Sequence, residues 1–205
     1  MDSMSIESLN QQHIDVLKEI GNIGAGNAAT ALAGMLGKKI DMDVPKVKIL
    51  GIREVAEVLG GEENIVAGIY FNVHGDIQGN IMFLLDLDSS KLLTNMLMGK
   101  SRENGELDEM DRSALREVGN ILSGAYIASL VSLTNFDIQH SVPSLAVDMA
   151  GAVMSVPAIQ FSHISDKVLF IETELKEGED LVEARFFLIP DEPSFKKILN
   201  SLGVY

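Results

Sequence analysis

A carboxylate and an amide recur at one spacing in two separate segments of the chain. In each segment a Glu is followed three residues later by an Asn, and a further polar residue stands four positions before the Glu. On a helix, positions i, i+4 and i+7 fall within a sector of roughly 60°, so each group would share one face. The groups are Asp15, Glu19 and Asn22 in the first segment, and Ser113, Glu117 and Asn120 in the second.

The chemistry open to such a face is limited by what the rest of the sequence lacks. It has no Cys and no G-x-S-x-G motif, and its four His residues, at 13, 74, 140 and 163, have no metal-ligand spacing. The glycine-containing run 21–26 is neither a Walker loop nor a G-x-G-x-x-G motif. We therefore expect no metal site and no cofactor. An amide and a carboxylate can orient water and hold a cation, so the substrate must bring an activated bond, such as an acyl phosphate on a protein with its own metal and lysine.

The two segments are copies of one sequence at an offset of 98 residues. Residues 15–45 align with 113–143 without a gap, and ten of the 31 positions are identical. Such an internal repeat must be found first, because it decides how the fold is read. The identical pairs are Leu17/Leu115, Glu19/Glu117, Gly21/Gly119, Asn22/Asn120, Ile23/Ile121, Gly26/Gly124, Leu32/Leu130, Ile40/Ile138, Val44/Val142 and Pro45/Pro143.

Either polar group alone would be read as an ordinary solvated helix face. The duplication favours a functional interpretation, because neighbouring surface positions such as Asn27/Ala125 have changed while the Glu and the Asn have not. An exposed Glu and Asn have no packing reason to persist. We therefore predict that Glu19, Asn22, Glu117 and Asn120 are catalytic.

Both segments predict long helices, over about 11–36 and 109–134, with apolar residues at helical spacing. Asn10 and Asp108 are favourable N-caps, and Gly37 and Asn135 suit the left-handed conformation that closes a helix. Glycines inside the first helix, at 21, 24 and 26, each cost about 1 kcal/mol relative to Ala, which predicts close packing against a sheet or the other copy.

Each helix precedes extended segments, a hairpin and a short helix. We expect strands near Val47–Leu50 and Ala146–Ala150, and hairpins at 65–85, turning at 74–76, and at 168–189, turning at 176–180. Short helices should follow near 88–98 and 194–202. The offset grows to about 104, which places a short insertion in a loop of the second copy.

The predicted fold is α+β: internally duplicated α/β modules around a pseudo-twofold axis, with long helices packed on a continuous antiparallel sheet. Residues 1–205 would form a single domain of two repeats, about 9–99 and about 107–203, joined through 99–106.

Composition narrows the range of partners. Sixteen basic and thirty acidic residues give a formal net charge of −14, which disfavours nucleic acid and anionic membranes and favours partners with a basic patch, or only keeps the protein in solution. No basic and apolar leader opens the chain, and no run approaches the roughly 18 apolar residues of a membrane span. We expect a cytoplasmic protein without membrane insertion.

The full pattern is an acidic residue or Ser, Glu four positions on, Asn three further, and Pro 23 further. It occurs as Asp15, Glu19, Asn22 and Pro45, and again as Ser113, Glu117, Asn120 and Pro143, where the first and last members of each set are supporting residues. The pattern resembles the CheC/CheX/FliY family of chemotaxis phosphatases over nearly the whole chain.

The resemblance implies that the substrate is phosphorylated CheY, whose aspartyl phosphate is hydrolysed to end the signal to the flagellar motor. Glu19 and Glu117 would each engage the active-site lysine of the regulator, while Asn22 and Asn120 would orient water in line with the phosphorus. Mg²⁺ would belong to CheY, and the receptor deamidase CheD would be a further partner. We expect a monomer. The alternative is a non-catalytic module that binds a response regulator or a flagellar-switch component and acts by sequestration.

Overall fold

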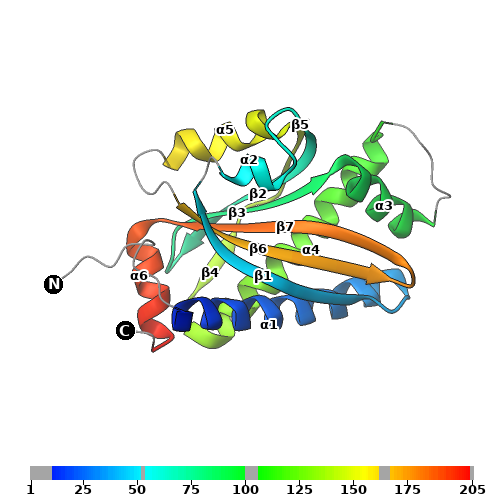
Figure 1. Ribbon diagram of the computed structural model, residues 1–205. Helices are drawn as coiled ribbons and strands as arrows, with labels where there is room; N and C mark the ends of the chain where they lie inside the picture. The colour runs from blue at the N-terminus through cyan, green and yellow to red at the C-terminus, as the bar shows by residue number, and fades with distance from the viewer. Residues whose placement is uncertain (1–10, 52–53, 100–105, 162–166, 204–205) are drawn as a thin grey trace.

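The computed structural model describes residues 11–51, 54–99, 106–161 and 167–203. Within these ranges each half of the chain begins with a long helix, which strands and shorter helices follow (Figure 1). The first half contains α1 Gln11–Leu36, β1 Asp41–Gly51, α2 Glu54–Val58, β2 Ile65–Gly75, β3 Gly79–Asp86 and α3 Leu87–Met98. The second half contains α4 Glu109–Thr134, β4 Ile138–His140, β5 Ser144–Met149, α5 Ala150–Phe161, β6 Lys167–Glu177, β7 Asp180–Pro190 and α6 Glu192–Ser201.

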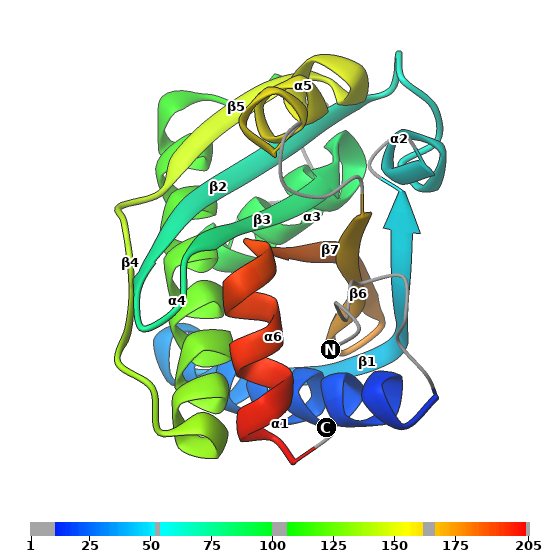
Figure 2. The same cartoon turned by 90° about the vertical axis from the view of Figure 1, so that its left-hand side faces the viewer.

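The strands form one antiparallel sheet in the order β1-β6-β7-β3-β2, and both β4 and β5 pair with the outer edge of β2. The long helices α1 and α4 lie on one face of the curled sheet, while α2 and α5 lie on the other (Figures 1 and 2). A large core fills the space under α1 and α4, and a smaller one lies under α2 and α5. The α+β class with long helices on a continuous antiparallel sheet is confirmed.

The strand order is consistent with a twofold relation between the halves. If β1, β2 and β3 are exchanged for β5, β6 and β7, the path β1-β6-β7-β3-β2-β5 reads the same backwards. The exchange places an axis between β3 and β7, which pair directly. The rotation itself and the repeat limits at 9–99 and 107–203 stay predictions.

The predicted limits of the long helices are confirmed, and the chemistry at their ends explains them. Asp108 and Asp111 exchange side-chain and backbone hydrogen bonds in a capping box at the start of α4. Gly37 and Asn135 follow the two helices with φ of 63° and 56°, the left-handed conformation that stops a helix. Asn10, the other predicted cap, lies outside the described residues.

The hairpins and the short elements need corrections. The first hairpin turns at Asp76–Gln78 rather than at 74–76, and the second turns tightly at Gly178 and Glu179 rather than over 176–180. Helices α2 and α5 were not predicted, and Ala150 begins α5 rather than ending a strand. The extra residues of the second copy do not all lie in a loop, because α5 has 12 residues where α2 has 5.

The glycines of the long helices explain how closely α1 packs. A Cβ on Gly21 would lie 3.3 Å from Val44 in β1, and a Cβ on Gly24 would lie 2.6 Å from the ring of Tyr126 in α4. The predicted close approach to the sheet and to the other copy is therefore found, although side chains rather than backbone make the contact. At Gly26 the prediction was wrong, because a Cβ there would meet nothing within 4 Å.

Tyr126 is the largest side chain in the contact between the long helices. Its ring stacks on Phe186 of β7, and its hydroxyl group is 2.9 Å from Thr173 Oγ1 in β6. Burial raises the pKa of the Tyr126 phenol to about 12, although the hydrogen bond with Thr173 opposes the shift. The phenol is therefore neutral at physiological pH and fixes α4 to the sheet beneath α1.

Candidate active site

The predicted catalytic residues of the first copy lie on the outward face of α1. Glu19 and Asn22 are exposed. Leu17, two residues before Glu19, and Ile20, between Glu19 and Asn22, are buried in the core. This alternation follows from helical geometry, because positions one or two residues away turn toward the sheet. Asp15 is exposed on the same helix, one turn before Glu19.

The second copy repeats this arrangement on α4. Glu117 and Asn120 are exposed, and Leu115 and Val118 are buried. Exposure of both carboxylates agrees with the prediction that they meet a partner rather than support the core. Within the described residues, Glu19, Asn22, Glu117 and Asn120 make no hydrogen bond or ion pair inside the chain. Their polar atoms are therefore available to an external substrate.

The structure brings all four predicted residues of the second copy into one hollow of about 510 Å³. Ser113, Glu117 and Asn120 reach it from α4, while Pro143 reaches it from the turn before β5. The hollow is also lined by Met98, Met110, Ala114, Arg116 and Val142. Apolar side chains thus lie beside the carboxylate and the amide, a mixture of apolar and polar groups that is common at protein–protein interfaces.

The first copy is less completely described. Its Pro45 lies in β1, the strand against which α1 packs, but the Pro45 side chain lies outside the described residues. The contact of Gly21 with Val44 shows that α1 approaches β1 directly beside this proline. The order of helix and proline along the chain therefore matches the second copy.

Sequence reasoning did not identify the apolar rim of the second hollow. Val142 is 83% exposed, whereas its counterpart Val44 is 4% exposed, although the residue type is the same. Met110 is 65% exposed and aligns with Gln12 of the first copy. No pattern in either segment distinguishes a buried valine from an exposed one, because the difference arises from the chain around it. A methionine three residues before Ser113 was a weak signal, because the sequence does not show whether that side chain is exposed.

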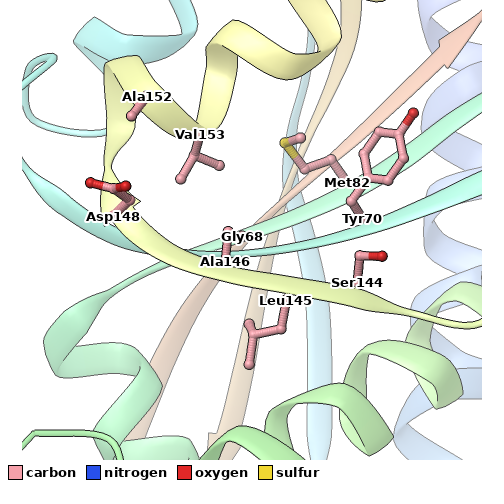
Figure 3. Close-up of a pocket in the computed structure, with 9 residues that line it drawn as sticks. All are labelled: Gly68, Tyr70, Met82, Ser144, Leu145, Ala146, Asp148, Ala152 and Val153. Carbon is pink, nitrogen blue, oxygen red and sulfur yellow. The ribbon is translucent and has the colours of Figure 1, made fainter.

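A different hollow, of about 440 Å³, lies on the α5 side of the sheet (Figure 3). It opens above Gly68, where a Cβ would be 2.6 Å from Val153 of α5, so only glycine lets this helix pack so closely. Asp148 is its charged lining residue, and it contains none of the predicted catalytic residues. The predicted catalytic residues lie instead on α1 and α4, on the other face of the sheet (Figures 1 and 2).

The predicted catalytic side chains carry groups that can position water and a cation. Among the described residues there is no group of three or more His, Asp or Glu side chains able to hold a metal ion. An exposed amide can hold a water molecule, and an exposed carboxylate can accept a hydrogen bond from an ammonium group. No helix in the described ranges has the length and apolar character needed to span a membrane.

Comparison with known proteins agrees with the geometry. Residues 13–49 match the profile of the CheC-like family, and residues 65–164 match that of the chemotaxis phosphatase CheX. The chain is 35% identical over 98% of its length to the CheY-P phosphatase CheC of Bacillus subtilis strain 168, of which it covers 99%. It is 23% identical to the putative CheY-P phosphatase CheC1 of Halobacterium salinarum, covering 93% of this chain and 96% of that protein.

Solved structures share the fold. The crystal structure of Thermotoga maritima FliY superposes with a TM-score of 0.76 at 26% identity, covering 96% of this chain and 98% of that one. CheX in the CheX-CheY-BeF3-Mg²⁺ complex from Borrelia burgdorferi superposes with a TM-score of 0.51 at 16% identity, covering 82% of this chain and 96% of that one. The fold and its repeated Glu-Asn face thus define a protein of the chemotaxis phosphatase class. The chain belongs to the CheC-like family.

Proposed function

We propose that this chain is a phosphatase that hydrolyses the aspartyl phosphate of phosphorylated CheY and thereby ends signalling to the flagellar motor. The observation that carries the proposal is the exposed Glu-Asn pair, present twice, with all four side chains free of partners in the described structure. A relative that is 35% identical over nearly the full length is a CheY-P phosphatase, which supports the same substrate here.

In the proposed mechanism the two side chains position groups rather than attack the substrate. Asn22 or Asn120 holds a water molecule in line with the phosphorus, and Glu19 or Glu117 binds the active-site lysine of the regulator. The regulator contributes Mg²⁺, which compensates charge on the phosphoryl oxygens. An aspartyl phosphate is already labile, and a ~100-fold acceleration requires only about 2.7 kcal/mol of transition-state stabilisation. Two oriented polar groups can supply that amount.

We propose further that the repeats at 9–99 and 107–203 each provide one complete site within a single domain. The palindromic strand order and the equivalent places of the two Glu-Asn pairs support this arrangement. On this account the protein acts in the cytoplasm as a monomer, and Asp15, Ser113, Pro45 and Pro143 support the sites. CheD is the further partner that the family resemblance implies.

The competing function is sequestration, in which the Glu-Asn faces only bind a regulator or a flagellar-switch component. The decisive experiment supplies phosphorylated CheY in large excess over the purified protein and follows phosphate release. A phosphatase releases phosphate from the whole excess, with an initial rate proportional to protein concentration. A sequestering protein would not accelerate phosphate release. It would only bind regulator, and binding would saturate at one or two regulators per chain.

A further inference from the structure

The basic side chains of this acidic protein fall into two groups. Of those that the structure describes, seven are held in ion pairs and five are not. The paired residues are Lys38, Lys39, Lys46, Lys176, Arg185, Lys196 and Lys197. Those without an ion pair in the described ranges are Lys18, Lys48, Lys91, Arg112 and Arg116.

Three of these five side chains, which have no ion pair within the described ranges, line hollows on α3 and α4, the helix that carries the second site. Arg116 lines the hollow that contains Glu117 and Asn120. Arg112 stands one helical turn earlier on α4, and together with Lys91 of α3 it lines a second hollow of about 590 Å³. Residues four apart share one helix face, so the two arginines form one stripe beside the catalytic pair.

This second hollow places Lys91 and Arg112 in a largely apolar setting. Its other lining residues are Ile65, Leu87, Glu106, Leu107 and Val147, and α3 lies next to the start of α4 (Figure 1). Lys91, Arg112 and Arg116 are each partly buried, so their aliphatic stems lie against the surface while the charged ends remain accessible. We call these three residues the cationic rim.

Among the described residues, the first copy has no such rim. The counterpart of Arg112 is Ile14, and only Lys18 matches Arg116. Lys91 and Lys196 are counterparts, because each stands five residues after the N-cap of its helix, Asp86 or Asp191. Lys196 forms an ion pair, with its Nζ 2.6 Å from Glu192 Oε1, whereas Lys91 has none within the described ranges. The three accessible cations are therefore a property of the second site, although the two sites share the Glu-Asn pair.

We infer that the cationic rim is a docking surface that captures the phosphorylated response regulator at the second site. This inference rests on the proposed function. A protein of net charge −14 repels a partner that presents a phosphoryl group among metal-binding carboxylates, because one Mg²⁺ offsets only part of their negative charge. A local cluster of cations offsets this repulsion at short range. The planar guanidinium groups of the arginines can also bind carboxylates through paired hydrogen bonds.

The rim should act on capture of the substrate rather than on the chemical step. Electrostatic steering raises association rates by 10-fold or more at low salt, and its effect falls as ions screen the charges. The second site should therefore have a lower KM than the first at low ionic strength. This advantage should shrink as salt is added.

The test isolates one site at a time. In an Asn22→Ala background, where only the second site works, Arg112→Gln with Arg116→Gln should lower kcat/KM about 10-fold at low salt, through KM, with kcat nearly unchanged. The difference should narrow as salt is raised. The matched control is Lys18→Gln in an Asn120→Ala background, where we expect a change below about twofold. Circular dichroism and thermal melting establish that each variant is folded.

Equal kcat/KM and equal salt dependence with and without the two arginines would overturn the docking role. A fall in kcat with unchanged KM would also overturn it, because the arginines would then act after binding. Failure of the proposed function has a different signature. In that case even the unsubstituted protein would release no phosphate above the rate of CheY alone.

Discussion

The two sites carry the same carboxylate and amide in different surroundings. Around the second pair stand an arginine stripe, an exposed methionine and a valine that is 83% exposed. The first copy has Ile14, Gln12 and a buried Val44 at the corresponding positions. The comparison teaches that the copies can keep the Glu and the Asn of the proposed chemistry while the exposed surface around them differs.

The largest effect should come from removing both amides. Replacing Asn22 and Asn120 together by Ala should lower phosphate release from phosphorylated CheY by about 100-fold, because neither site can then position water. The fold should persist, since both side chains are exposed and Ala favours a helix. The assay compares initial rates at matched protein concentration, and a melting curve serves as the control. Wild-type activity in this variant would remove the catalytic role of the repeated face.

A second prediction separates the roles of the two side chains. In the Asn22→Ala background, Glu117→Ala should raise KM and lower kcat, because the carboxylate binds the lysine of the regulator both before and during the reaction. In the Glu19→Ala background, Asn120→Ala should mainly lower kcat. Steady-state kinetics with varied phosphorylated CheY distinguish the two patterns. Identical changes for both substitutions would contradict the division of roles.

A third prediction concerns the contact between α1 and α4. Gly24→Ala would place a Cβ 2.6 Å from the Tyr126 ring, so we expect a loss of about 1–3 kcal/mol in the free energy of unfolding. Gly26→Ala, two positions along the same helix, meets nothing within 4 Å and should gain up to about 1 kcal/mol. Urea denaturation of the pair measures the difference. Equal stability of the two variants would show that the helices do not meet at Gly24.

The smallest effect is a pH dependence that arises from Tyr126 in the second copy, which aligns with Ala28 in the first. The pKa of its phenol is raised from 10.0 to about 12, so the unfolded chain loses this proton first. The contribution of Tyr126 is therefore complete below pH 10 and is lost as the pH rises toward about 12. Denaturation series across this range should show the loss, and Tyr126→Phe should reduce it. An unchanged pH profile for Tyr126→Phe would contradict the assignment.

Much of this arrangement could be predicted because its signals are local. Good caps and left-handed closing residues determine the ends of the long helices, and the capping box at Asp108 and the φ of Asn135 show both effects. The outward position of Glu117 and Asn120 follows from their spacing alone.

Other features depended on contacts that no local pattern encodes. Helix α2 has only five residues, and α5 is apolar along most of its length, so neither shows a clear helical period. Gly26 resembles Gly24 in sequence, but only Gly24 faces a ring from the other copy. The opposite exposure of Val44 and Val142 likewise depends on the chain packed around each valine.

The central claim is that the chain contains two complete and independent sites. Its most direct test measures phosphate release by Asn22→Ala, by Asn120→Ala and by the unsubstituted protein, with phosphorylated CheY well below KM. The account predicts that each single variant keeps substantial activity and that the two rates add up to the unsubstituted rate. Loss of nearly all activity in both single variants would instead show one composite site, and would contradict the claim.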